Sequence, residues 1–161
     1  MIPNSGPMVP NGAVPRLIVL GASAVAASHT GDTNPSTLAT IAVPANAMGA
    51  NGVLRITAQW SFTNNANAKV TSMSFGGTAF GNQNIASSAS ARSQTQIANR
   101  GASNSQVGPS PAQANFGGAA GAVTTAAIDT TQAQSISIGV TLANAADTAT
   151  LESYLVELMP G

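Results

Sequence analysis

VLRITAQWSF, residues 53–62, is the stretch of the chain that decides its fold class. Apolar and polar side chains alternate along it, which is the pattern of a β-strand with one buried face. The predicted buried face carries Leu54, Ile56, Ala58, Trp60 and Phe62. The predicted solvent face carries Arg55, Thr57, Gln59 and Ser61. Because strands of this kind must pair and bury one face, the stretch predicts a β-sheet with a packed core.

Further strands are predicted on both sides of this one. Residues 64–67 form an Asn-rich turn, and residues 69–75 return as a strand that Gly76 and Gly77 end. The other predicted strands cover residues 16–21, 37–43, 135–142 and 148–158. Between residues 81 and 121, rich in Ser, Asn, Gly and Pro, only residues 93–98 suggest a strand. No segment shows the spacing of an amphipathic helix.

Seven or eight short strands without a helix predict an all-β fold, an antiparallel β-sandwich with a jelly-roll-like arrangement or else a barrel. The predicted core consists of Leu54, Ile56, Trp60, Phe62, Ile136, Ile138, Val140, Tyr154 and Val156. Simple alternation along residues 148–158 places Glu152 on the face of Tyr154 and places Glu157 on the opposite face. The end of this strand is apolar on both faces, which predicts either a central position in its sheet or a position against a neighbour.

Residues 1–15, MIPNSGPMVPNGAVP, contain four prolines and no hydrophobic period. We predict an extended N-terminal arm over residues 1–15 and a single β-sandwich domain over residues 16–161. The arm either folds back on its own domain or is held by a neighbouring subunit, and we favour the neighbour. The predicted partner-binding residues are four apolar residues of the arm: Ile2, Met8, Val9 and Val14. The apolar run at 17–27 resembles part of an export signal, but the prolines before it argue against that interpretation.

The composition excludes several classes of protein. Of 161 residues only five are Lys or Arg and five are Asp or Glu, so 6% are charged against about 25% in an ordinary soluble domain. A net charge of zero excludes binding to nucleic acid or to an anionic membrane through a basic field. The absence of Cys excludes a disulfide scaffold, and 43% hydrophobic residues exclude charged disorder. Low net charge favours association between copies.

No arrangement of residues predicts catalysis. His29 is the single histidine, and Ser28 and Asp32 beside it do not supply the geometry of a hydrolytic triad. The carboxylates are scattered, and no metal-ligand spacing occurs. The glycine pairs lack the Lys-Ser/Thr of a phosphate-binding loop and predict turns, while Trp60 lies on the core face. We therefore expect no catalytic residue, no metal, no cofactor and no enzyme activity.

The charges are unevenly distributed along the sequence. All five cationic residues precede residue 101: Arg16, Arg55, Lys69, Arg92 and Arg100. Four of the five acidic residues follow it: Asp129, Asp147, Glu152 and Glu157. Two explanations stay open, namely ion pairs between strands of one subunit and complementary faces between subunits.

Three segments carry a resemblance to a known class of protein. They are IAVPANAMGANGVLRITAQWSFTNNANAKVTSMSFGGTAF at 41–80, IANRGASNSQV at 97–107 and TLESYLVELMP at 150–160. Together they cover about half the chain, and they resemble structural proteins of tailed-bacteriophage virions.

The resemblance implies a β-sandwich or jelly roll that assembles as a homotrimer. It also implies that the protein belongs to the virion, which is assembled in the host cytoplasm. It further implies a capsid decoration, or cement, protein whose partners are other copies of itself and the major capsid protein or another virion protein. The alternative is a carbohydrate-binding, receptor-recognising module of a tail fibre. A third hypothesis is an ice-binding surface, but the sequence lacks the regular Thr-x-Thr ladder that such a surface needs.

Overall fold

The computed structural model describes residues 16–113 and 119–161. These residues form β-strands joined by turns and loops, and none of them is helical. The described part thus has no helix that could cross a membrane. The predicted arm at residues 1–15, with Ile2, Met8, Val9 and Val14, lies outside the described residues.

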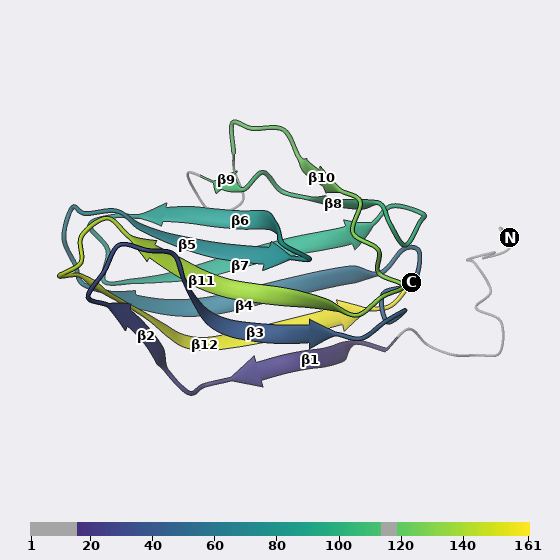
Figure 1. Ribbon diagram of the computed structural model, residues 1–161, viewed down its shortest axis with the longest axis horizontal. Coiled ribbons are helices and arrows are strands. Elements are labelled where there is room, and N and C mark those ends of the chain that lie inside the picture. Colours follow the sequence, from purple (N-terminus) through teal and green to yellow (C-terminus); the bar gives the residue numbers. More distant parts are fainter. Residues whose placement is uncertain (1–15, 114–118) are drawn as a thin grey trace, which may run out of the picture.

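The strands form two sheets packed face to face (Figure 1). The first, the β4 sheet, has the order β1 (Ile18–Ser23), β12 (Thr148–Met159), β4 (Val53–Phe62), β7 (Ser90–Asn99), β8 (Gln106–Gly108) and β10 (Thr124–Ala126), and β2 (Ala27–Thr30) also pairs with β12. The second, the β5 sheet, has the order β3 (Ser36–Val43), β11 (Gln134–Leu142), β5 (Lys69–Phe75), β6 (Thr78–Ile85) and β9 (Ala112–Gln113). All pairs are antiparallel except β6 with β9.

The eight longest strands are connected as a jelly roll. Along the chain the first of them pairs with the last, β1 with β12, and the second with the seventh, β3 with β11. The third pairs with the sixth, β4 with β7, and the fourth with the fifth, β5 with β6. This nesting is that of a long hairpin rolled into two four-stranded sheets, which is the jelly-roll arrangement. The predicted antiparallel β-sandwich is confirmed, and the barrel is not formed.

The core lies between the two sheets, and eight of the nine predicted core residues are buried. Trp60 and Phe62 stack with their ring centroids 6.1 Å apart. Tyr154 is the exception, because it is only half-buried. Its ring lies beside Gly21 of the edge strand β1, where a Cβ would sit 3.6 Å from Tyr154 Cε2. An edge strand without a side chain at that point leaves part of the ring uncovered.

The predicted alternation along residues 148–158 is wrong in its first half, because β12 carries a β-bulge relative to β4. Leu151 lies opposite Trp60 while Ser153 lies opposite Gln59, so Glu152 is the extra residue. A bulge shifts the two-residue period by one, so residues before and after it exchange faces. Two residues predicted to face outward are thereby buried: Ala149 and Leu151. The predicted central position of the strand is confirmed, since β12 lies between β1 and β4.

Residues 78–99 contain two long strands, β6 and β7, where the pattern predicted only short pieces. The buried face of β7 is largely polar, with Ser93 and Thr95 beside Ile97. Their hydroxyls are satisfied inside the sandwich, since Ser93 Oγ donates to Gln83 Oε1 at 2.8 Å and Thr95 Oγ1 donates to the Phe80 carbonyl at 2.8 Å. Because hydroxyls replace apolar groups on the inner face, the hydrophobic alternation is lost.

Candidate functional site

The exposed apolar side chains of the described residues gather around the start of β1. Six large ones are exposed: Leu17, Ile18, Val19, Val25, Val123 and Met159. Leu17, Ile18 and Val19 lie where β1 begins, whereas Val25 follows the end of β1 and Val123 precedes β10. Met159 ends β12, the neighbour of β1, and the register that pairs Ile18 with Leu158 brings Leu17 alongside Met159. Four of these six exposed side chains therefore lie at one corner of the β4 sheet, where β1 begins and β12 ends (Figure 1).

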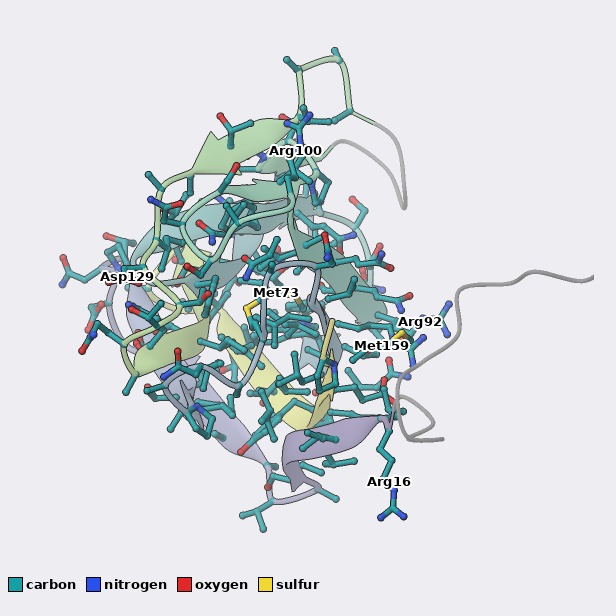
Figure 2. All side chains as sticks on the ribbon, turned by 90° about the vertical axis from the view of Figure 1, so that its right-hand side faces the viewer. Arg16, Met73, Arg92, Arg100, Asp129 and Met159 are labelled. Atoms are coloured by element: carbon teal, nitrogen blue, oxygen red, sulfur yellow. The ribbon has the colours of Figure 1, made fainter. Side chains whose placement is uncertain are left out.

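A pocket of about 190 Å³ opens at this corner, on the outer face of the β4 sheet. It is lined by Leu17, Val53, Arg55, Gln96, Glu157 and Met159. Arg55 lies opposite Gln96 on one side and opposite Glu157 on the other, so three neighbouring strands contribute to one surface. In Figure 2, Met159 projects from the outer side of the sandwich, whereas Met73 lies between the sheets. We call this feature the outer pocket.

The polar side of the outer pocket is an ion pair. Arg55 Nε and Nη2 both lie 2.7 Å from Glu157 Oε2. The Arg55 side chain is 46% exposed and that of Glu157 only 11%. The two charges cancel locally, so the pocket presents apolar walls, a neutral ion pair and the amide of Gln96. Such a surface fits an uncharged ligand with apolar groups better than an ion.

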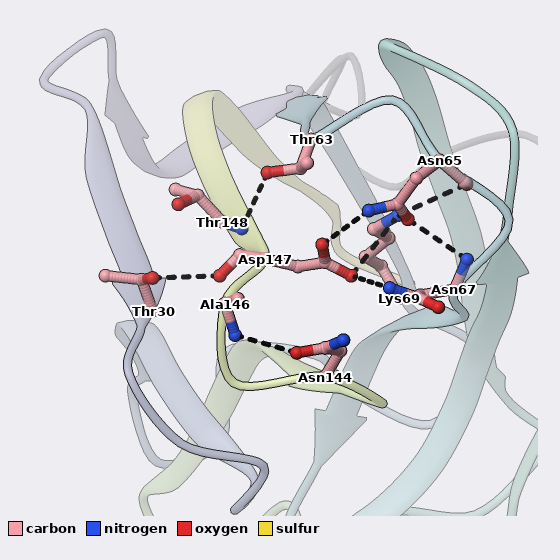
Figure 3. Close-up of polar contacts among 9 residues, drawn as sticks. All are labelled: Thr30, Thr63, Asn65, Asn67, Lys69, Asn144, Ala146, Asp147 and Thr148. Carbon is pink, nitrogen blue, oxygen red and sulfur yellow. Dashed lines mark hydrogen bonds and ion pairs between the residues drawn. The ribbon is translucent and has the colours of Figure 1, made fainter.

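A second polar cluster is buried where the β4–β5 and β11–β12 loops meet (Figure 3). Lys69 is fully buried, and its Nζ lies 3.7 Å from Asp147 Oδ2 and donates to Asn65 Oδ1 at 2.5 Å. Asn65 Nδ2 donates to Asp147 Oδ1 at 2.6 Å, and Asn67 Nδ2 donates to Oδ2 at 3.0 Å. Both carboxylate oxygens of Asp147 therefore have amide donors.

The cluster holds Asp147 in its ionised form. The hydrogen bond from Asn65, with smaller contributions from Asn67 and the charge of Lys69, keeps the pKa of Asp147 below its usual value of 3.8 although burial opposes this. Lys69 is fully buried among these partners, so its amine is out of reach of a substrate. The cluster therefore joins two loops and supplies no reactive group.

The two ion pairs also bear on the uneven charge distribution. Arg55 with Glu157 and Lys69 with Asp147 both join an early cation to a late acid across one chain. At these four residues the explanation by pairs within the subunit is confirmed.

The residues around His29 do not form a catalytic triad. His29 Nε2 lies 3.6 Å from Asp32 Oδ1, so the histidine does have an acidic neighbour. The hydroxyl of Ser28, however, shares a hydrogen bond of 2.8 Å with Thr150 Oγ1 across β2 and β12. A nucleophile must instead be bonded to the base, so the arrangement has no activated serine.

The carboxylates of β12 are too far apart for glycoside hydrolysis. The bulge places Glu152 on the outer face, where it accepts a hydrogen bond from Ser61, so the expectation that Glu152 and Glu157 lie on opposite faces is wrong. Their partners Ser61 and Arg55 are six residues apart on β4, which corresponds to roughly 20 Å. Glycosidase carboxyl groups are about 5–10 Å apart.

The remaining sequence candidates are structural. Gly76 and Gly77, with φ of 52° and 81°, form the turn between β5 and β6, as predicted. Trp60 is buried in the core, as predicted. Within residues 16–113 and 119–161, no three His, Asp or Glu side chains gather as a metal site would require.

Sequence reasoning missed the outer pocket, although one signal was present. Val53 and Met159 are apolar residues on the face of β4 and β12 that alternation assigns to solvent. Apolar side chains at the ends of two strands, with Leu17 before a third, are the pattern from which an exposed apolar corner could have been predicted.

Comparison with known proteins yields no match to any protein-family model, curated protein sequence or solved structure. Function must therefore be inferred from the jelly roll, its surface and the outer pocket.

Proposed function

We propose that the protein is a structural component of a tailed-bacteriophage virion, a decoration or cement protein that binds the outer capsid shell as a homotrimer. One observation carries the proposal. The described residues form a charge-poor jelly roll whose exposed apolar side chains are concentrated at one corner of the β4 sheet. Jelly rolls are used for viral capsid proteins, although lectins and cupins share the fold.

The distribution of charge supports assembly between many copies. The chain has ten charged residues, and four of them are neutralised in ion pairs within the subunit. Lys69 and Asp147 are buried, so they contribute no surface charge. Copies with so little surface charge approach one another without a large electrostatic penalty, which suits a protein that covers a shell densely.

The exposed corner supports a binding role. Leu17, Val19 and Met159 are each about half exposed, although burying such side chains is worth roughly 1.5–3 kcal/mol apiece. Contiguous exposed apolar side chains on a soluble domain mark an interaction surface. β1 is also an edge strand without a charged residue, which leaves it open to association.

The described surface favours the shell over the tail-fibre alternative. Sugar-binding sites commonly use an exposed aromatic ring as a stacking platform. Among residues 16–113 and 119–161 the aromatic residues are buried or, for Tyr154, half-buried. A carbohydrate-binding module would therefore lack that platform in the described part of the chain.

Electron cryomicroscopy of native particles tests the proposal. Density fitted by this jelly roll should recur at many equivalent positions over the capsid surface. A few copies confined to the tail tip would favour the receptor-binding alternative, and absence from the particle would overturn both.

Removal of residues 1–15 should leave a domain with the same β-type circular dichroism spectrum that no longer stays on the particle. Full occupancy by the truncated protein would show that residues 1–15 do not hold the protein on the particle.

A further inference from the structure

We propose that the outer pocket receives residues 1–15 of a neighbouring copy of the chain. This inference deepens the proposed function by naming the occupant of the exposed corner, and it rests on that function in so far as it requires self-assembly. It assigns a partner to the pocket between Leu17, Arg55, Gln96 and Met159.

The chemistry of the two surfaces matches. Residues 1–15 contain no charged side chain, and the four residues predicted to bind a partner, Ile2, Met8, Val9 and Val14, are apolar and spaced along the segment. The pocket has apolar walls in Leu17, Val53 and Met159, and its one ion pair is already satisfied. A neutral segment can enter without stranding a charge, because neither Arg55 nor Glu157 has to give up its partner.

The prolines decide how such a segment can bind. A peptide that added to the edge of β1 as a further strand would need regular backbone N–H donors. Residues 3, 7, 10 and 15 are prolines, which lack that donor and interrupt a ladder of hydrogen bonds. The segment is therefore better suited to lie across a sheet face, with side chains in a pocket, than to extend the sheet. Gln96 also lines the pocket, and a glutamine amide can both donate to and accept from a peptide group.

The connection to β1 favours a neighbour over the same copy. Leu17 lines the pocket, and Pro15 stands only two residues before it. Proline restricts Val14 to extended conformations, so an immediate reversal into the same pocket is disfavoured. Fifteen extended residues span at most about 50 Å, which is enough to reach another subunit. Repetition of one weak contact over a closed oligomer would give stable binding through effective concentration.

Cysteine cross-linking between two different chains tests the inference. The protein has no cysteine, so each introduced thiol is unique. A full-length V9C chain is mixed with a full-length Q96C chain and oxidised gently, and M8C and V14C replace V9C to sample the register. Because each chain has one thiol, a disulfide between arm and pocket joins two subunits. We expect a cross-linked pair for at least one arm position.

The matched control is a full-length T40C chain, which replaces the Q96C chain and is mixed with the same arm variants. Thr40 is exposed on β3 in the other sheet, so it offers an accessible thiol on the opposite side of the sandwich. The Q96C chain should give at least about tenfold more cross-linked product than T40C, because only a docked arm has a high effective concentration at the pocket. Equal yields with the two partners, or no product from any arm position, would overturn the inference.

A chain that carries both V9C and Q96C tests the remaining alternative, in which the arm enters the pocket of its own subunit. Disulfide-linked multimers on non-reducing gels are expected. A monomer closed by an internal disulfide would show that the arm enters its own pocket, and the inference would be wrong. These measurements need no phage particle. Cross-linking without particle binding would overturn the proposed function alone, whereas particle binding without cross-linking would overturn this inference alone.

Discussion

Asp147 is a buried carboxylate whose Oδ2 lies 3.7 Å from Nζ of the buried Lys69. Its folded-state pKa is lowered mainly by the hydrogen bond from Asn65. A lowered pKa contributes stability that is fully present above the unfolded-state pKa near 4 and is lost as the pH falls through the folded pKa. We predict that Asp147→Asn destabilises the protein at pH 7, and that the difference from wild type shrinks as the pH falls below about 4.

Urea denaturation at pH 7, 5 and 3 measures this effect. Asp129→Asn is the control, because the pKa of Asp129 is also lowered, chiefly by the Thr131 hydroxyl, but the side chain is exposed and faces no buried cation. It should change stability less at pH 7. A loss for Asp147→Asn that is the same at every pH would show that shape, and not charge, is what the cluster requires.

Trp60 is the largest side chain of the core, 2% exposed and stacked on Phe62. Replacing it by alanine leaves a cavity that the two packed sheets cannot close fully. Trp60→Ala should therefore cost about 3–5 kcal/mol of unfolding free energy, measured as a lower urea midpoint with an unchanged slope. Gln59→Ala, its exposed neighbour on the other face, should stay within about 0.5 kcal/mol. Similar values for the two variants would contradict the assignment of faces.

The turn between β5 and β6 offers a sharper comparison at the level of elements. Gly76 and Gly77 both have positive φ, which costs an alanine roughly 1–2 kcal/mol. A Cβ on Gly76 would also lie 2.6 Å from Ile128 Cγ2, whereas one on Gly77 would meet nothing within 4 Å. Gly76→Ala should therefore lower the thermal midpoint more than Gly77→Ala. Equal shifts would mean that Ile128 moves aside without cost.

Alternation of apolar and polar residues predicts those strands whose buried side chains are apolar and whose exposed side chains are polar. The bounds of β4 and β5 follow directly from the sequence, since every inward residue of β4 is apolar and glycines end β5. Only residues 93–98 of β7 were predicted, because Ser93 and Thr95 face inward and their burial depends on acceptors contributed by β6. The bulge at Glu152 was not predicted, because only the register against β4 reveals an extra residue. The outer pocket combines three strands and Leu17, so it exists only once the sheet has formed.

At the scale of the whole molecule, the scarcity of charge limits what can hold copies together. Arg55 and Glu157 neutralise each other, and the second ion pair is buried. In the proposed assembly, long-range attraction between oppositely charged faces is therefore weak, and contact between apolar side chains such as Leu17 and Met159 supplies most of the binding free energy. Salt screens the attraction between charges, whereas it leaves the association of apolar side chains unchanged or strengthens it.

Self-association should consequently resist salt. Raising NaCl from about 0.05 M to 1 M shortens the screening length to about 3 Å, yet the sedimentation profile of the proposed oligomer should not shift toward monomer. Ammonium sulfate should favour the oligomer further, because sulfate strengthens apolar burial. Met159→Glu should dissociate it at any salt concentration, since it places a charge at the rim of the outer pocket. Thr40→Glu, on the opposite sheet, is the control and should leave the oligomer intact. Dissociation of the wild-type oligomer by NaCl alone would mean that charge complementarity, and not the apolar corner, holds the subunits together.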